Sequence, residues 1–422
     1  MIKVSKYKEF SWVAFGQIIA AIASLALVRV MTELLNPSQY GEVALAMTIV
    51  AFATQVLMGG LNVGIGRYYA IARKDSMLTS YVFSVKDITT NIGKIILTIG
   101  LFFLILFYWS GNNKLAMFSV LVTIIALLSS YNSVFNNVIN TARRRIVSSL
   151  HLILEVLLKL IFLLIMLQLS FDYYKAEVVL MAFAISAFII FLLYKKYVDS
   201  YIDTLVNDKK CDKDWVSDIW GYSKHFILWT VLIWVQQISE RWLLQIYTTL
   251  EEVGIYAMLY TLGYAPVLML FKVSIRFMYP IAYEKTEIQG GILTSQFIIR
   301  GRIKKMILIG SLIAIVGFFV TDIAHESLFY YLVSEEYREY SYLLKWFVFS
   351  GVLFGMGEVV VMKMQSDMKV ELLGRVKSLI GIMGLSVNFI GVYYAGFYGM
   401  IAALVVFTII NLCAMYYASD YE

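Results

Sequence analysis

Charged residues are scarce in this chain. Of its 422 residues only 15% are Asp, Glu, Lys or Arg, whereas 60% are hydrophobic, and the mean hydropathy is +0.76. A soluble domain usually carries about 25% charged residues, because its surface must be hydrated. The shortage of charge therefore excludes most soluble enzymes and any disordered protein, and it indicates an integral membrane protein.

Residue types that build disulfides and metal sites are also few. The chain has two cysteines, Cys211 and Cys413, and no Cys-x-x-Cys motif, so neither a disulfide framework nor a thiolate metal site is predicted. The histidines lie far apart in the sequence, which argues against a zinc cluster. The sequence has no glycine-rich ATP-binding loop and no nucleophile–base arrangement. We therefore expect no bound cofactor and no enzymatic activity.

Long apolar runs dominate the sequence. Their length and flanking charge predict twelve membrane-spanning helices of about 20 residues each. The first run, 10–28, follows three lysines and no small-residue cleavage site follows it, so we interpret it as an uncleaved span rather than a signal peptide. The last two spans are separated by a predicted turn at Tyr394-Ala395-Gly396-Phe397. The predicted spans are 10–31, 41–61, 84–109, 115–141, 146–168, 178–197, 225–247, 253–277, 305–321, 343–364, 378–394 and 397–417.

Lysine and arginine are distributed unevenly among the predicted loops. With the N-terminus placed in the cytoplasm, 27 of the 35 fall on the cytoplasmic side and 4 on the opposite side. Positive residues close to membrane spans mark the cytoplasmic face. Both termini are therefore predicted to be cytoplasmic. The net charge of +6 is explained by membrane anchoring, and no nucleic-acid binding is expected.

A polar stretch at the middle of the chain divides the spans into two sets of six. Residues 1–198 are predicted to form an N-lobe and residues 219–422 a C-lobe, joined by a cytoplasmic linker over 199–218. A weak internal repeat agrees with this division, because Gly41-Glu42-Val43-Ala44 matches Gly254-Ile255-Tyr256-Ala257 at an offset of 213 residues. Both sets start on the same side, so the predicted fold is an all-α membrane protein of two pseudo-symmetric six-helix lobes related by an axis along the membrane normal.

Basic residues inside the spans are candidates for function, because an isolated charge costs at least ~2.5 kcal/mol at the centre of a membrane helix. Arg29 and Arg241 lie in the outer part of the first helix of their lobes. They are either interface anchors or a pair of anion clamps, since the planar guanidinium binds two phosphate oxygens at once. Lys94 either lies deep in the bilayer or extends to the cytoplasmic interface.

Acidic residues inside the spans are candidates for ion coupling. Glu155 and Lys159 are spaced i, i+4 and are predicted to pair on one helix face, as a structural ion pair or as a coupling site. Glu358 lies near mid-bilayer and is either paired with a basic residue of another helix or protonated. Glu240, next to Arg241, is a third candidate of the same kind.

Two uncharged stripes also fall on single faces of predicted spans. One comprises Ser129, Asn132, Ser133, Asn136 and Asn140. The other comprises Tyr256, Tyr260 and Tyr264. The amides either join neighbouring helices or contact a hydroxyl-rich ligand, and the tyrosines either pack in the core or at the interface or contact sugars through ring and hydroxyl. The candidate substrate contacts are Asn132, Asn136, Tyr256 and Tyr260.

Short motifs recur along the chain at positions before, between and within the predicted spans. They are Phe10-Ser11-Trp12, Phe15-Gly16-Gln17, Leu35-Asn36-Pro37-Ser38-Gln39-Tyr40-Gly41, Gly64-Ile65 with Arg67-Tyr68-Tyr69, Gln237-Ile238-Ser239-Glu240-Arg241-Trp242 and Val253-Gly254-Ile255-Tyr256-Ala257. Together these motifs resemble one group of membrane proteins, the polysaccharide-transporter branch of the multidrug/oligosaccharidyl-lipid/polysaccharide exporter superfamily. At Glu240 that group often has Asp instead.

The resemblance implies a monomer in a bacterial cytoplasmic membrane, with a central cavity that opens alternately to each side. It implies a flippase for an undecaprenyl-diphosphate-linked oligosaccharide in O-antigen, capsule or exopolysaccharide assembly, coupled to H⁺ or Na⁺ and working with the polymerase or ligase of that pathway. Arg29, Arg67 and Arg241 lie in matching segments and are implied to contact the diphosphate. The alternative is an ion-coupled antiporter of small cationic drugs from the same superfamily.

Overall fold

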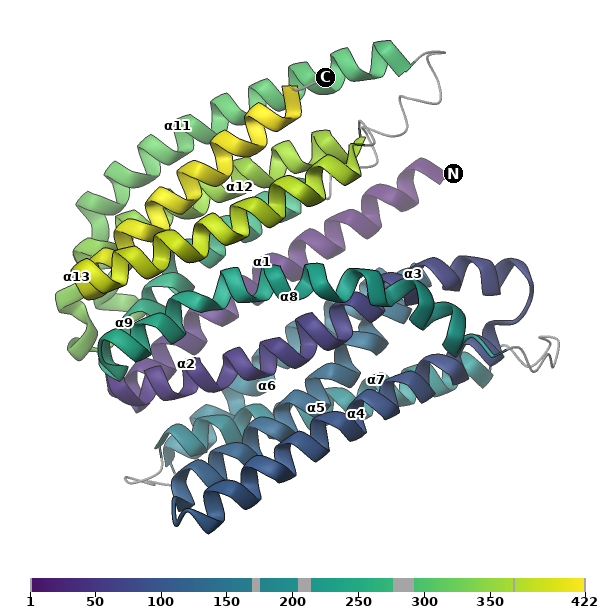
Figure 1. The fold of residues 1–422 in the computed structure, drawn as a ribbon, viewed down its shortest axis with the longest axis horizontal. Coiled ribbons are helices and arrows are strands. Elements are labelled where there is room, and N and C mark those ends of the chain that lie inside the picture. The colour runs from purple at the N-terminus through teal and green to yellow at the C-terminus, as the bar shows by residue number, and fades with distance from the viewer. Residues whose placement is uncertain (1, 169–174, 204–213, 276–291, 367–368, 421–422) are drawn as a thin grey trace. The chain divides into compact units, whose positions relative to one another are not determined.

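The computed structural model describes residues 2–168, 175–203, 214–275, 292–366 and 369–420, and it shows no strand in these ranges (Figure 1). Ten of the described helical segments are long and apolar enough to cross a membrane. One of them, Glu371–Ser419, contains the last two predicted spans, and α8 (Val216–Tyr247) carries the predicted span 225–247. The described helices therefore confirm the all-α, multi-pass prediction and contain the predicted spans, except that residues 276–277 of the span 253–277 lie outside the described ranges.

Helix starts in the turns are set by short polar side chains. The Asn112 side chain accepts a hydrogen bond from the backbone N–H of Leu115 at 3.1 Å and so caps the start of α5 (Asn113–Thr141). Thr249 does the same for α9 (Leu250–Leu259), accepting from the N–H of Glu252 at 3.3 Å. Such caps satisfy backbone donors that have no partner within the helix.

Contacts divide the chain into two compact units. The first unit comprises residues 1–34 and 42–234. Within it, α5 packs against α3, α4 and α7, and α1 packs against α6. The boundary between the two units falls within α8, between Trp234 and Val235. The division into lobes at residues 198 and 219 remains a prediction. The remaining helices of this unit are α1 (Ile2–Leu34), α2 (Pro37–Ala51), α3 (Met58–Lys74), α4 (Leu78–Trp109), α6 (Arg145–Gln168) and α7 (Lys175–Asp203).

The second unit comprises residues 35–41 and 235–422. Its central helix is α12 (Leu344–Ser366), which packs against α11 (Ile292–Leu332) and α13 (Val370–Asp420). Phe347 of α12 is fully buried. A 3₁₀ segment, η3 (Glu335–Leu343), joins α11 to α12.

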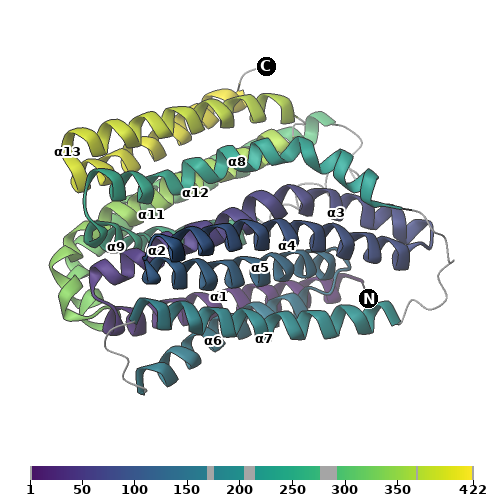
Figure 2. The same ribbon diagram turned by 60° about the horizontal axis from the view of Figure 1, so that its bottom comes forward.

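The long element α13 consists of two helical arms joined by a kink. Ala395 (φ −136°, ψ 17°) and Gly396 (φ 55°, ψ −132°) leave helical geometry, which confirms the predicted turn at residues 394–397. The positive φ of Gly396 is a conformation that glycine adopts without steric cost. Both views show the arms side by side (Figures 1 and 2).

A substitution at Gly399 tests how tightly these two arms pack. A Cβ at this position would lie 1.9 Å from the carbonyl oxygen of Gly391 on the opposite arm, so Gly399→Ala must push the arms apart. Overpacking of this kind typically costs about 1–3 kcal/mol. We expect a lower unfolding temperature in detergent, followed by tryptophan fluorescence. The control is Gly381→Ala on the same helix, where a Cβ meets no described heavy atom within 4 Å. Equal unfolding temperatures for the two variants would contradict the packing.

Each half of the chain has a π-helical turn in its second transmembrane segment. The first, η1 (Phe52–Leu57), joins α2 to α3, and the second, η2 (Tyr260–Tyr264), follows α9. In both turns a threonine hydroxyl donates to the carbonyl four residues earlier: Thr54 to Val50 at 3.1 Å and Thr261 to Ala257 at 2.8 Å. π-Turns are rare in helices and often mark functional segments.

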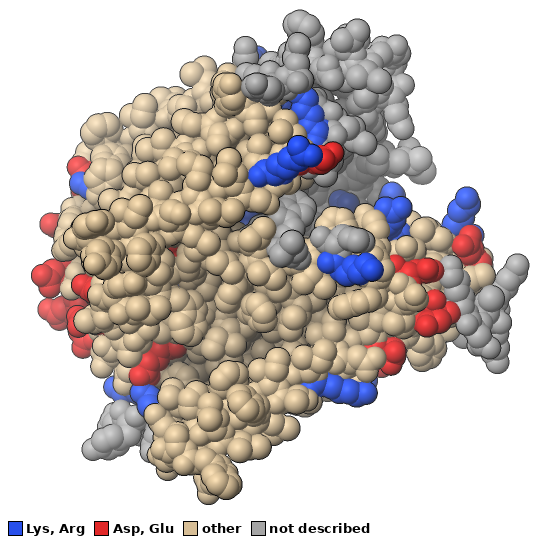
Figure 3. All heavy atoms as spheres, viewed as in Figure 1, with Lys and Arg blue, Asp and Glu red and all other residues tan. Residues whose placement is uncertain are grey.

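Charged side chains gather at the ends of the helices, and a broad uncharged surface lies between them (Figure 3). Apolar residues are exposed along several helices, among them Phe102 of α4 and Ile323 of α11. Large exposed apolar surfaces are unfavourable in water, whereas the lipid chains of a membrane would cover them. The exposed acidic residues of α9 and η3 are Glu251, Glu335, Glu336 and Glu339.

Candidate functional site

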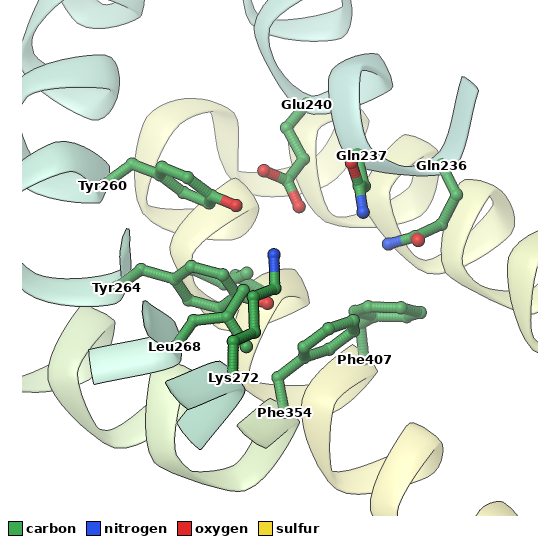
Figure 4. A pocket seen from close by; sticks show the side chains of 10 residues that line it. Gln236, Gln237, Glu240, Tyr260, Tyr264, Leu268, Lys272, Phe354 and Phe407 are labelled. Atoms are coloured by element: carbon green, nitrogen blue, oxygen red, sulfur yellow. The ribbon is translucent and has the colours of Figure 1, made fainter. Parts of the chain in front are cut away.

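A polar cavity of about 80 Å³ lies within the second unit. A cavity needs only about 10–15 Å³ of such space to hold one water, so this cavity has room for a small polar group. Figure 4 shows the glutamine amides, the Glu240 carboxylate and the Lys272 amine converging on it. It is lined by Gln236, Gln237 and Glu240 of α8, Tyr260 and Tyr264 of η2, Leu268, Lys272, and Phe354, Leu404 and Phe407.

Glu240 is the buried carboxylate of this cavity. The residue is 4% exposed, and the fully buried Tyr256 hydroxyl donates to its Oε2 at 2.7 Å. A buried carboxylate is costly unless it is hydrogen-bonded or paired. Tyr256 thus satisfies one oxygen of the Glu240 carboxylate without lining the cavity. Tyr260, one helical turn further along, lines the cavity.

Two cationic side chains belong to the same region. The Lys272 amine points toward the Glu240 carboxylate (Figure 4), although the residue itself is exposed. The Arg241 guanidinium lies 5.7 Å from the centre of the Tyr260 ring, which is within reach of a cation–π interaction. The second unit therefore brings together one carboxylate, Glu240, two cationic side chains, Lys272 and Arg241, and aromatic rings.

Lys272 is the charged residue of the cavity lining that sequence reasoning missed, and the amides of Gln236 and Gln237 were missed as well. Its charge was assigned to the cytoplasmic membrane anchors, because it lies near the end of a predicted span. The signal that could have found it is spacing, since Tyr260, Tyr264, Leu268 and Lys272 recur every four residues. Residues at this spacing share one helix face, so the tyrosine stripe continues to a lysine.

The tyrosine stripe is organised by the π-turn. The rings of Tyr260 and Tyr264 stack with centroids 4.5 Å apart and planes 24° apart. Tyr264 is buried, whereas Tyr260 is partly exposed on the cavity side. Tyr260 is therefore the member of the pair that is more open to contact a ligand, and an aromatic ring of this kind suits the ring face of a sugar.

The asparagine stripe lies in the first unit, where it joins helices. Asn132 is buried and its Nδ2 donates to the carbonyl of Ala187 on α7 at 3.0 Å. Asn136 accepts hydrogen bonds from Ser148 of α6 and, at 3.0 Å, from Asn140. Of the two interpretations of this stripe, these contacts support interhelical packing.

Three further basic candidates lie in the first unit, and none of them lines the cavity. Arg29 pairs with Glu33, one turn further along α1. Lys94 is exposed on α4, and its amine lies 3.3 Å from the side-chain oxygen of Asn91. Arg67 lies over the Tyr222 ring, 4.4 Å from its centre.

The remaining acidic candidates form ion pairs. The Lys159 amine lies 2.7 Å from Glu155 on the same face of α6, as the i, i+4 spacing predicts. The Lys377 amine lies 2.6 Å from Glu358, so Glu358 of α12 is paired with a basic residue of α13. Of the two alternatives for Glu358, the structure supports the paired one.

The fold is that of known membrane transporters. Lipid II flippase MurJ in an inward closed conformation aligns with a TM-score of 0.73 and 12% identity, over 98% of this chain and 87% of that chain. An inward-facing multidrug resistance MATE transporter of the MOP superfamily aligns with a TM-score of 0.65 and 15% identity, over 94% and 93% of the two chains. A MOP superfamily transporter from Pyrococcus furiosus aligns with a TM-score of 0.53 and 14% identity, over 98% and 96%.

This fold is therefore shared with multi-pass membrane transporters of the MOP superfamily. The chain belongs to the polysaccharide biosynthesis protein family, whose sequence model matches residues 7–284. No curated protein matches the chain by sequence.

Proposed function

We propose that this protein is a flippase for a polyprenyl-diphosphate-linked oligosaccharide. It moves the headgroup from the cytoplasmic to the outer leaflet of a bacterial cytoplasmic membrane by alternating access, with both termini in the cytoplasm. The observation that carries the proposal is the cavity around Glu240, where amides, tyrosines and the cationic Lys272 meet, with Arg241 beside the Tyr260 ring, inside a member of the polysaccharide biosynthesis family. We further propose that the protein acts as a monomer alongside a polymerase or ligase.

The cavity groups match the chemistry of such a headgroup. Lys272 and Arg241 supply positive charge for the diphosphate, and charge-assisted hydrogen bonds are the stronger ones. Gln236 and Gln237 provide amide donors and acceptors for hydroxyls, and Tyr260 provides a ring face. At about 80 Å³ the cavity admits one small group rather than a whole oligosaccharide. In this proposal the cavity binds part of the headgroup first, and the cavity must widen before the rest of the glycan can enter.

The driving force has two sources in this proposal. The membrane potential favours the outward movement of an anion by about 2.3 kcal/mol per uncompensated charge at 100 mV. Exchange of H⁺ or Na⁺ adds to it, and Glu240 is the acid best placed for coupling, because it lies in the cavity beside Lys272 (Figure 4). Glu155 and Glu358 are each held by a lysine within 2.7 Å, so we assign them secondary roles.

The second candidate function is an antiporter of small organic cations. The observation in its favour is the buried Glu240 carboxylate, which a cationic drug would pair with. Lys272 and Arg241 weigh against it, since two positive groups near one carboxylate repel a cation.

Binding in detergent distinguishes the two candidate functions. We expect a short-chain polyprenyl-diphosphate disaccharide to raise the unfolding temperature, because a ligand at a hundredfold excess over its Kd stabilises the folded state by about 2.7 kcal/mol. We expect tetraphenylphosphonium, tested at equal concentration, to leave that temperature unchanged. Stabilisation by the organic cation alone would favour the antiporter and overturn the proposal.

A further inference from the structure

The cavity around Glu240 has walls of three chemical kinds. The Glu240 carboxylate forms an acidic wall, the side chains of Gln236 and Gln237 form an amide wall, and the rings of Phe354 and Phe407 form an apolar wall. Figure 4 shows the carboxylate and both amides directed toward the same space, with the two phenylalanine rings below the amides in this view. All of these residues belong to the second unit. A ligand group that enters the cavity therefore meets an acid, amides and an apolar surface.

The charges at the cavity exclude ionised groups from its interior. A carboxylate or a phosphate inside it would be repelled by Glu240, and an ammonium group would be repelled by the Lys272 amine, which points toward Glu240 (Figure 4). A hydroxyl is neutral, but it would leave the rings of Phe354 and Phe407 without an apolar partner. The group that fits has no net charge, one hydrogen-bond donor, one acceptor and a small apolar end.

The Glu240 carboxylate calls for a donor on the ligand. The Tyr256 hydroxyl donates to Glu240 Oε2 at 2.7 Å but does not line the cavity. An ionised carboxylate only accepts hydrogen bonds and can accept several, so its cavity face suits an N–H or O–H group. Gln236 and Gln237 offer the opposite chemistry, because each side-chain amide can donate to a carbonyl oxygen. One secondary amide in the cavity would complete both kinds of hydrogen bond.

Resting on the proposed function, we propose that this cavity recognises the 2-acetamido group of the first sugar of the headgroup. The acetamido N–H donates to Glu240, its carbonyl oxygen accepts from Gln236 and Gln237 through its two lone pairs, and its methyl group packs against Phe354 and Phe407. A cavity of about 80 Å³ has room for these few heavy atoms but not for a long acyl chain. The substrate class is therefore a polyprenyl-diphosphate-linked 2-acetamido-2-deoxyhexose, extended by further sugars.

The chemistry of such a sugar places the diphosphate beside the cavity. The acetamido nitrogen is bonded to C2 of the ring, and the diphosphate is bonded through oxygen to the neighbouring carbon, C1. Lys272 is an exposed residue whose amine reaches the cavity, and Arg241 lies 5.7 Å from the centre of the Tyr260 ring. In the proposal these two cations meet the group on C1 while the group on C2 is inside. The cavity thus reads the first sugar and leaves the rest of the glycan unread.

The test compares three short-chain ligands by calorimetric titration of the full-length protein in detergent. Each is a farnesyl diphosphate monosaccharide, and the three differ only at C2 of the glucose ring, which carries a hydroxyl, an acetamido or a hexanoylamido group. We expect the acetamido ligand to bind at least about tenfold more tightly than the hydroxyl ligand, because it adds a second hydrogen bond and a buried methyl group. We expect the hexanoylamido ligand to bind no more tightly than the hydroxyl ligand, because its chain exceeds the cavity.

Glu240→Gln should remove the preference for the acetamido ligand. The glutamine oxygen can accept from Tyr256, so the new NH₂ group would face the acetamido N–H, donor against donor. The readout is the ratio of the two affinities, since a general loss of diphosphate binding weakens both ligands alike. Gln237→Leu removes one amide donor and should lower the ratio even if Glu240→Gln fails to fold. The matched control is Glu371→Gln, the same change at an exposed acid of α13, and it should keep the ratio.

The possible results separate this inference from the proposed function. Equal affinity for the acetamido and hydroxyl ligands overturns the inference alone, because diphosphate binding is still seen. An acetamido preference that is unchanged in folded Glu240→Gln and Gln237→Leu also overturns it, since recognition then lies elsewhere. Tight binding of the hexanoylamido ligand contradicts the size limit that the cavity sets. Failure of all three ligands to bind overturns the proposed function itself, and this inference with it.

Discussion

Replacing Lys272 by methionine is expected to lower the rate of lipid-linked oligosaccharide translocation by about tenfold to hundredfold. The Lys272 amine points into the cavity toward Glu240, and Lys272 is the positive residue among those that line the cavity (Figure 4). In the proposed mechanism the Lys272 amine forms a hydrogen bond with the diphosphate during translocation. A hydrogen bond to a charged group contributes about 1.5–3 kcal/mol, and losing that energy in the transition state corresponds to a fall in rate of about tenfold to hundredfold. Methionine keeps the length and apolar stem of the side chain, so the shape of the cavity wall should change little. The measurement is the initial translocation rate in liposomes at matched protein content.

The matched control for Lys272→Met is Lys377→Met. Lys377 belongs to the same unit and pairs with Glu358 at 2.6 Å, but it does not line the cavity. Its loss should reduce thermal stability while leaving the rate within a fewfold of the unmodified protein. An unchanged rate in Lys272→Met would contradict the assigned role, and so would equal losses in both variants.

Replacing Glu240 by glutamine is expected to remove the response to an ion gradient. The glutamine side-chain oxygen can still accept the hydrogen bond from Tyr256, which keeps the buried pair satisfied. The amide carries no charge and cannot exchange a proton or hold a sodium ion in the same way. Imposing an H⁺ or Na⁺ gradient should therefore accelerate the unmodified protein but not the variant. The gain available from one charge moving through 100 mV is about 2.3 kcal/mol, an upper limit of roughly fiftyfold.

Glu358→Gln is the control for ion coupling. Glu358 is also an acid inside a transmembrane helix, but a lysine of α13 already neutralises it. The variant should keep its gradient response, with a lower unfolding temperature because Lys377 loses its partner. If Glu358→Gln loses the response and Glu240→Gln retains it, coupling belongs to α12 and the assignment to Glu240 is wrong.

The helices could be predicted from the sequence because lipid imposes a simple rule on it. Every backbone group must be satisfied inside the bilayer, so each long apolar run becomes a helix. The kink at Gly396 was predictable for the same local reason, since glycine is the residue that tolerates a positive φ. The tyrosine stripe could also be found, because its spacing is a property of one helix.

Contacts between helices could not be predicted in this way. The partner of Glu358 is Lys377, which lies 19 residues further along, and their pairing depends on how α12 and α13 are rotated against each other. The hydrogen bond from Asn132 to the carbonyl of Ala187, which favours the packing role of the asparagine stripe, likewise depends on how two helices are rotated against each other. Lys272 was counted with the loop charges because hydropathy reports depth in the membrane and not direction around a helix.

The most direct measurement of the central claim is headgroup translocation in liposomes. The purified protein is reconstituted with a fluorescent polyprenyl-diphosphate oligosaccharide in both leaflets, and a membrane-impermeant quencher is added outside. A flippase renders the inner-leaflet population accessible over time, faster than in protein-free vesicles, and Lys272→Met slows this phase. Absence of translocation for any such lipid, together with transport of tetraphenylphosphonium by the same vesicles, would show that the protein is a cation antiporter and not a flippase.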